Sequence, residues 1–204
     1  MKRVNDTNIN TPDYWDNVYV EERGSGKRRI DNDRLESLVG EMKDYQMRHP
    51  QSGPYELLDV GCGDGELMRF VHAYIPTWSK SGIDVTPKAI SFAQQDSPNM
   101  KFQVGNIYEI PFPENSFDIV FCGETLEHLD APEAAIEQLF KVCKPGGRVV
   151  ISTPNEHANY SDEHIHEFTV GECISMTSKH GNVYYDRIRV VCGGISVIWS
   201  TEKK

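Results

Sequence analysis

The sequence lacks the long apolar run that would mark a membrane protein and the leader that would mark a secreted one. None of its 204 residues lies in a stretch that approaches the roughly 20 apolar residues needed to cross a bilayer. The chain starts with two cations that no apolar segment follows, so we expect no signal peptide. We therefore expect a cytoplasmic protein without a membrane partner.

Paired cysteines and a positive net charge are also missing. The five cysteines are scattered and form no C-x-x-C pair, which argues against a disulfide framework and a zinc ribbon. A formal net charge of −10 disfavours long-range attraction to nucleic acid or to an anionic membrane. The local basic stretch "GKRRI" leaves a contact with nucleic acid open. Nothing in the sequence indicates an oligomeric state.

The composition that is present, 38% hydrophobic and 25% charged, is typical of a globular domain. The length suits one domain, so we expect a single domain over residues 1–204. Residues 1–11 are polar and are expected to fray. Helical spacing of apolar residues follows, and we interpret residues 1–50 as a helical N-terminal cover on an α/β core at 55–204.

Short apolar runs alternate with helical patterns from residue 55 onward. The predicted strands are "YELLDV", "KSGIDV", "MKFQVG", "SFDIVFC", "RVVIST", "YYDRIRVV" and "GISVIWS". Alternation of this kind predicts βαβ units and a parallel sheet, and the short link "CGG" predicts that the last two strands form an antiparallel edge hairpin. The fold class is therefore α/β: a doubly wound, mostly parallel, seven-stranded sheet of Rossmann-like type.

A glycine-rich turn follows the first predicted strand of this core, in "LLDVGCGDGE". Glycine allows backbone to approach a ligand or to take positive φ, and a helix N-terminus offers free N–H groups. A dinucleotide fingerprint that started at Gly61 would need a third glycine at Glu66, so the pattern differs from G-x-G-x-x-G. Asp59 precedes the first glycine by two residues, where it would repel a pyrophosphate and attract a cation.

This turn resembles the first signature of the class I S-adenosylmethionine-dependent methyltransferases. "GIDV", "VGNIYEIPFPENSFDIVFC" and "CKPGGRVVIST" resemble later signatures, in order, over about residues 55–169. The resemblance implies methyl transfer from S-adenosylmethionine. It implies that Asp84 takes the ribose hydroxyls, that Asn106, where members often have Asp, contacts the adenine amino group, and that Ile107 lies against the adenine. The implied cofactor-binding residues are Asp59, Gly61, Gly63, Asp84, Val85, Asn106 and Ile107.

A second cluster, "CGETLEHLD", follows the fourth predicted strand. Glu124, Glu127 and His128 stand at i, i+3 and i+4, which places them on one face if the segment is helical. They would cap a helix, act as a base with its orienting carboxylate, or hold a metal. In the metal-free interpretation, His128 and Glu127 are the catalytic residues.

The histidines of "HIHEFT" extend this cluster. Together with Glu-x-x-Glu-His they resemble metal-dependent O-methyltransferases of ubiquinone biosynthesis and of small-RNA 3′ ends. The resemblance implies a divalent metal, Mg²⁺, Mn²⁺, Fe²⁺ or Zn²⁺, which would lower the pKa of a bound hydroxyl. The implied ligands are Glu124, Glu127, His128 and His166, with His157 and His164 as weaker candidates.

The favoured acceptor is a hydroxyl of a small molecule. The RNA-modifying group carries a tryptophan soon after its metal histidine, whereas here the next one is Trp199. RNA 2′-O-methylation and a non-catalytic, methyltransferase-like binding subunit stay as alternatives. Tyr14, Trp15 and Tyr19 would either line the mouth of the pocket or pin their helix to the sheet. Basic residues in "GKRRI" would meet an anionic substrate or stay solvated.

Overall fold

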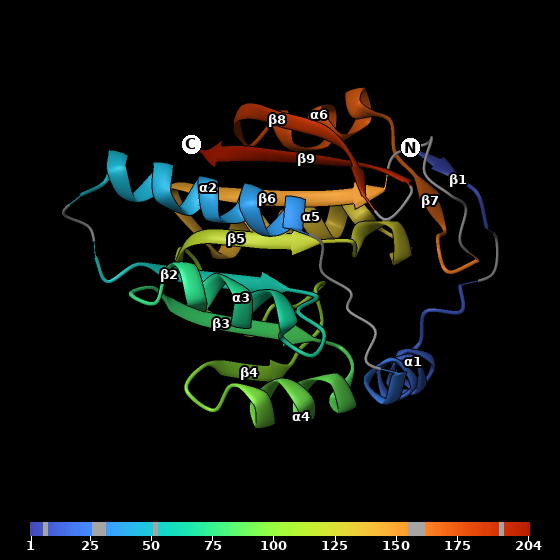
Figure 1. Ribbon diagram of the computed structural model, residues 1–204. Helices are drawn as coiled ribbons and strands as arrows, with labels where there is room; N and C mark the ends of the chain where they lie inside the picture. The colour runs from blue at the N-terminus through green and yellow to red at the C-terminus, as the bar shows by residue number, and fades with distance from the viewer. Residues whose placement is uncertain (6–7, 26–31, 51–52, 155–161, 192–193) are drawn as a thin grey trace.

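The computed structural model describes residues 1–5, 8–25, 32–50, 53–154, 162–191 and 194–204, with the backbone path alone for 32–34, 185–191 and 194–197. Within these ranges one seven-stranded sheet has the order β4-β3-β2-β5-β6-β9-β8 (Figure 1). Its strands are β2 (Glu56–Val60), β3 (Ser79–Asp84), β4 (Lys101–Val104), β5 (Phe117–Gly123), β6 (Cys143–Pro154), β8 (Gly181–Val191) and β9 (Gly194–Lys203).

The pairing directions agree with the predicted sheet. Strands β4, β3, β2, β5 and β6 pair in parallel, whereas β9 pairs antiparallel with both β6 and β8. The predicted α/β class and the antiparallel edge hairpin are therefore confirmed. The basic stretch "GKRRI", residues 26–30, lies wholly outside the described residues.

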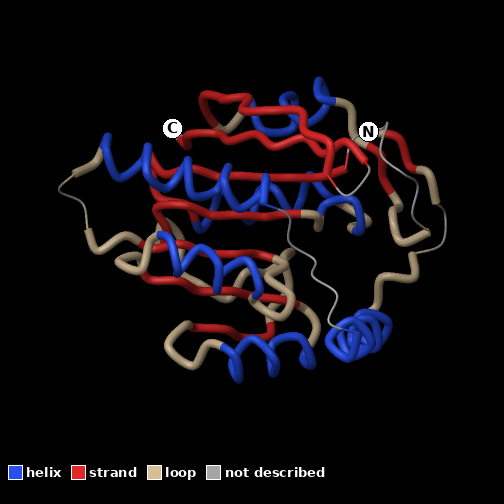
Figure 2. The backbone as a smooth tube through the Cα atoms, in the orientation of Figure 1, coloured by secondary structure: helices blue, strands red, loops and turns tan. Residues whose placement is uncertain are grey.

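Helices cover both faces of the sheet, as the tube in Figure 2 also shows. They are α1 (Pro12–Ser25), α2 (Asn32–Arg48), α3 (Glu66–Tyr74), α4 (Pro87–Asp96), α5 (Pro132–Val142) and α6 (Val170–Ser178). Leu57 of β2 belongs to the core cluster with α2, α3 and α4, and Leu58 to the cluster with α5 and α6. Since neighbouring strand residues point to opposite faces, one buried strand contributes to both layers.

Residues 1–5 and 8–11 make defined contacts with distant parts of the chain, which differs from the fraying that we expected for this segment. Strand β1 (Lys2–Arg3) pairs antiparallel with β7 (His166–Glu167), and the amide of Val4 donates to the carbonyl of Ile165 at 3.0 Å. Side-chain amides of Asn5 and Asn10 donate to carbonyl oxygens of Asp162 and Glu163 at 2.9 and 2.8 Å. The polar side chains that suggested fraying donate hydrogen bonds to backbone carbonyls of a distant loop instead.

This N-terminal segment lies beyond the carboxyl ends of the parallel strands, where Figure 1 places α1, β1 and β7. Ligands of doubly wound sheets bind at that edge. None of the helices in the described ranges is both long and apolar enough to cross a membrane.

Candidate active site

The glycine turn at the end of β2 is shaped by three positive backbone angles. Gly61, Gly63 and Gly65 have φ of 80°, 53° and 74°, a region that side chains other than glycine rarely adopt. A Cβ added at Gly61 would lie 2.3 Å from the hydroxyl oxygen of Thr125. One added at Gly63 would lie 2.3 Å from the hydroxyl oxygen of Tyr19. The turn therefore requires glycine both for its backbone and for the space above it.

A buried carboxylate braces this turn from the next strand. Asp84 ends β3 and is 8% exposed; one oxygen accepts from the amide of Gly63 and the other from the amide of Thr86, both at 2.9 Å. A carboxylate can accept about four hydrogen bonds, so a carboxylate at this strand end is chemically suited to ligand hydroxyls. Asp59, in β2, is 2% exposed.

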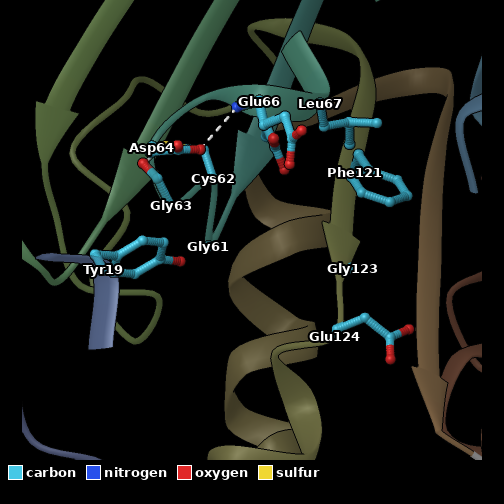
Figure 3. A pocket seen from close by; sticks show the side chains of 11 residues that line it. Tyr19, Gly61, Cys62, Gly63, Asp64, Glu66, Leu67, Phe121, Gly123 and Glu124 are labelled. Carbon is cyan, nitrogen blue, oxygen red and sulfur yellow. Dashed lines mark hydrogen bonds between the residues drawn. The ribbon is translucent and has the colours of Figure 1, made fainter. Parts of the chain in front are cut away.

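A pocket opens over the turn (Figure 3). Its walls come from the end of β2, the start of α3, the end of β5 and Tyr19 of α1. The lining residues are Tyr19, Asp59, Gly61, Cys62, Gly63, Asp64, Glu66, Leu67, Phe121, Gly123 and Glu124. Four of them carry carboxylates, so the pocket favours a cationic ligand.

Four residues predicted to bind the cofactor lie outside this lining: Asp84, described above, and three others along the same sheet edge. Val85 follows β3 and is 41% exposed. Asn106 follows β4, and its side-chain oxygen accepts from the amide of Tyr108 at 2.9 Å. Ile107 packs against the core cluster that contains α5. All three lie where the parallel strands β3 and β4 end.

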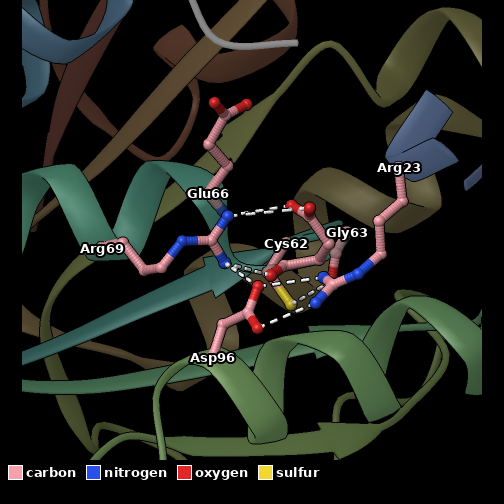
Figure 4. A network of polar contacts seen from close by, with 7 residues as sticks. Arg23, Cys62, Gly63, Glu66, Arg69 and Asp96 are labelled. Atoms are coloured by element: carbon pink, nitrogen blue, oxygen red, sulfur yellow. Dashed lines mark hydrogen bonds and ion pairs between the residues drawn. The ribbon is translucent and has the colours of Figure 1, made fainter. Parts of the chain in front are cut away.

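Helix α1 reaches the pocket through Tyr19 and is held by charged groups. Arg23 donates to both carboxylate oxygens of Asp96 on α4 at 2.9 Å, and Arg69 of α3 lies 3.6 Å from the same carboxylate (Figure 4). The hydrogen bonds from Arg23 lower the pKa of Asp96. The backbone amide of Lys88 donates a hydrogen bond to a carboxylate oxygen of Asp16 in α1 at 2.8 Å.

Glu124, Glu127 and His128 do not share a helical face, which corrects the expectation from their spacing. Glu124 has φ of 49°, and only Leu126–His128 form a short 3₁₀ turn, η1. The hydroxyl of Ser152 donates to Glu124 at 3.0 Å, whereas that of Thr153 donates to Glu127 at 3.1 Å. Ser152 and Thr153 are neighbours on β6 and point to opposite faces, so the two glutamates are drawn apart.

His128 lies beside the buried Glu127, which is 1% exposed. Its Nδ1 is 3.0 Å from the carbonyl oxygen of Glu163, and its Nε2 is 3.7 Å from Oε1 of Glu127. Because a carbonyl can only accept, Nδ1 carries the hydrogen and Nε2 of the neutral ring can take up a proton. Trp15 of α1 makes a T-shaped contact with this imidazole, with ring centroids 5.0 Å apart.

A group of possible metal donors forms around His128. One donor atom each of Glu127, His128 and His164 lie within 4.8 Å of one another. Burial, with His128 nearby, lowers the pKa of His164 to about 4. In the part of the chain that the structure describes, Glu124 and His166 are not members of this group. His157 lies outside the described residues.

His166 is placed differently from the prediction. It is buried in β7 opposite Arg3, and burial lowers its pKa. The amide of Ile165 donates to the carbonyl of Glu127 at 2.8 Å, which fixes the loop beside His128. Sequence reasoning missed Ser152, Thr153 and Glu163 as partners of the cluster, because their types and spacing carry no signal.

Comparison with known proteins identifies the type of domain. A family model described as a methyltransferase domain matches residues 58–151. An uncharacterized methyltransferase of Schizosaccharomyces pombe is 36% identical over 104 residues, which are 46% of this chain and 37% of the yeast protein. A probable chloroplastic tocopherol O-methyltransferase of Oryza sativa subsp. japonica is 32% identical over 123 residues, 54% of this chain and 34% of the rice protein.

The chain thus spans little more than a third of the length of these relatives. Further relatives are named as N- and C-methyltransferases. Among solved structures, magnesium protoporphyrin IX methyltransferase from Synechocystis PCC 6803 with bound SAH has the same fold. It aligns with a TM-score of 0.71 at 14% identity, over 95% of this chain and 98% of that one. By its domain match and its relatives, the segment at residues 58–151 is similar to methyltransferase domains, and the fold of the chain is that of the solved methyltransferase.

Proposed function

We propose that the protein methylates a hydroxyl group of a small molecule, with S-adenosylmethionine bound at the carboxyl ends of β2 and β3. The observation that carries this proposal is a pocket lined by glycines and carboxylates that ends at Glu124, four residues before an imidazole, that of His128, which can accept a proton. In this proposal residues 1–204 form one domain, in which 1–50 cover the core at 55–204.

The residues of the pocket fit such a cofactor. A Cβ at Gly63 would lie 2.3 Å from the hydroxyl oxygen of Tyr19, so the glycine lets Tyr19 lie directly against the turn on the wall of the pocket. Carboxylate groups suit the positive sulfonium, and the lone pairs of Asp84 suit two neighbouring hydroxyls. We assign cofactor binding to Asp59, Gly61, Gly63, Asp84, Val85, Asn106 and Ile107.

Catalysis is assigned to His128 with Glu127. When bound, S-adenosylmethionine supplies a methyl group that an oxygen nucleophile can attack. Nε2 of His128 would take the proton of the acceptor hydroxyl, and the carboxylate 3.7 Å away would stabilise the imidazolium. The carbonyl of Glu163 holds the tautomer in which Nε2 is free of hydrogen.

A divalent metal is a second form of the proposal. Of the ligands inferred from the sequence, Glu127 and His128 lie in one donor group, with His164 as the third member. One carboxylate and two imidazoles can hold Mn²⁺, Fe²⁺ or Zn²⁺, and such an ion would lower the pKa of a bound hydroxyl. Glu124 and His166 would have to move to complete the predicted set of four.

Calorimetry with S-adenosylmethionine and S-adenosylhomocysteine tests the pocket. We expect the wild-type protein to bind both and Gly63→Arg to bind neither, because the arginine would occupy the space above the turn. Gly146→Arg is the matched control, since Gly146 also has positive φ, 75°, but has open space around its Cβ position. It should keep wild-type affinity. Affinity that survives in Gly63→Arg would contradict the assigned pocket.

A further inference from the structure

The carbonyl that accepts from His128 is also held by the N-terminal part of the chain. Nδ1 of His128 lies 3.0 Å from the carbonyl oxygen of Glu163. The side-chain amide of Asn10 donates to the same oxygen at 2.8 Å, although Asn10 and Glu163 are 153 positions apart in the sequence. A carbonyl oxygen has two lone pairs, so one can accept from the imidazole and the other from the amide. The oxygen that orients His128 is therefore fixed from a second side.

The carboxylate of Glu163 is held by helix α1. Tyr14 lies in the first turn of this helix, and its hydroxyl donates to Oε1 of Glu163 at 2.6 Å, the length of a strong bond to an ionised acceptor. The next residue, Trp15, makes T-shaped contacts with the rings of Tyr14 and His128, with centroids 5.3 and 5.0 Å apart. Two neighbouring residues of α1 thus reach the imidazole, one directly and one through Glu163.

The same helix forms part of the wall of the pocket. Tyr19 lines the pocket, and its hydroxyl oxygen would lie 2.3 Å from a Cβ added at Gly63. Tyr14 and Tyr19 stand on one helix, so the docking that brings Tyr14 to Glu163 also brings Tyr19 to the glycine turn. The imidazole and one wall of the pocket therefore depend on the same element.

We propose that Tyr14 and Asn10 are positioning residues, which act through Glu163 to keep hydrogen on Nδ1 of His128 and to leave Nε2 free. This inference rests on the proposed function, in which Nε2 takes the proton of the acceptor hydroxyl. It serves the metal form of that proposal as well, because a histidine that binds a metal through one ring nitrogen donates the hydrogen of the other. The role of both residues is to set the tautomer and the direction of the ring rather than to move the proton.

Nitrogen NMR of protein labelled with ¹⁵N-histidine tests this role, because the shifts of Nδ1 and Nε2 report which of them carries hydrogen. Spectra are recorded in a chelator, at a pH about two units above the ordinary histidine pKa of about 6.5. Signals that are lost in His128→Asn assign the ring. We expect the Nδ1–H tautomer in the wild-type protein and a mixture of both tautomers in Tyr14→Phe and in Asn10→Ala. Tyr14→Phe keeps the ring that contacts Trp15.

Tyr55→Phe is the matched control. The hydroxyl of Tyr55 donates to the carbonyl of His49 at 2.6 Å, so this variant loses a bond of the same length. Tyr55 precedes β2, at the end of that strand opposite to the glycine turn. The control should keep the wild-type tautomer. Methyl transfer gives a second measurement: Tyr14→Phe should lower kcat about tenfold and change the KM for S-adenosylmethionine less than about twofold.

Three results would each overturn the inference. They are an unchanged tautomer in Tyr14→Phe and Asn10→Ala, a wild-type ring with its hydrogen on Nε2, and the same mixture of tautomers in Tyr55→Phe. Failure of the proposed function would look different. If the tautomer shifted as expected but His128→Asn kept the wild-type rate of methyl transfer, the positioning of the ring would stand and the assignment of His128 as the base would fail.

Discussion

At the scale of single residues, the site depends on a few backbone angles and on the identity of neighbouring side chains. The turn after β2 needs glycine at 61 and 63 because Thr125 and Tyr19 occupy the space beside them. Glu124 and Glu127, three positions apart, bond to adjacent residues of β6 on opposite faces. Spacing alone therefore gave the wrong geometry for this pair, whereas residue type indicated the polar character of the site.

The catalytic assignment makes a prediction about His128. His128→Asn should reduce methyl transfer to a hydroxyl acceptor by at least about a hundredfold, because the variant lacks a proton acceptor at Nε2. Its affinity for S-adenosylmethionine should not change. Transfer of labelled methyl groups to a panel of catechols and polyols, with binding measured in parallel, checks this.

The same assay, repeated in a chelator, separates the two forms of the proposed mechanism. If the wild-type protein kept its activity in the chelator, the metal-dependent mechanism would be excluded and His128 would remain as the base. Activity that is lost in the chelator and returns only when Mn²⁺ or Zn²⁺ is added would support metal binding by Glu127, His128 and His164. Transfer to amines but not to hydroxyls would contradict the proposed acceptor.

At the scale of elements, α1 lies over the pocket without burying any residue of its own. Its attachment to α4 consists of polar contacts, among them the paired bonds from Arg23 to Asp96 and the bond from the amide of Lys88 to Asp16. An element held in this way opens at low free energy while the core stays folded. Ligand entry past Tyr19 can use such local opening.

Removing the ion pair should loosen α1 alone. We expect Arg23→Gln to raise the amide hydrogen-exchange rate of α1 by up to about fivefold, since partly exposed ion pairs contribute at most about 1 kcal/mol. The midpoint of global unfolding should barely move. Arg48→Gln, which removes the exposed pair between Arg48 and Asp44 inside α2, is the control and should leave α1 unchanged. Unaltered exchange in α1 of Arg23→Gln would contradict this account.

At the scale of the whole molecule, stability should depend on pH through a buried lysine far from the pocket. Lys80 is the second residue of β3, and its ammonium donates to the carbonyls of Ile75 and Trp78 at 2.7 and 2.8 Å. Burial lowers its pKa to about 8, from 10.5. Between these values the unfolded chain binds more protons than the folded one, so the free energy of unfolding rises with pH.

We therefore expect the contribution of Lys80 to add up to about 3 kcal/mol to the free energy of unfolding between pH 8 and 10.5. Lys80→Met, which keeps the apolar stem, should remove this part of the rise in urea titrations. Lys141→Met removes an exposed lysine and serves as the control. An identical pH slope in wild type and Lys80→Met would show that burial does not depress this pKa.

The sequence determined the sheet and the resemblance to methyltransferase domains. Alternating apolar runs and helical patterns set the order of the elements. The glycine turn and Asp84 could be placed at the strand ends because both are recognised from short stretches of sequence. Polar residues 1–11 gave no such local signal, and their strand pairing with β7 depends on a partner more than 160 positions away.

Tertiary structure decided which acidic and imidazole groups meet. Glu124 lines the pocket over the glycine turn and Glu127 joins His128 and His164, because β6 presents Ser152 and Thr153 to opposite faces. Tyr19 and Trp15 reach two parts of the site from one helix, which only the docking of α1 shows. Side chains distant in sequence are brought together by the packing of the whole chain, and spacing along a segment does not encode that packing.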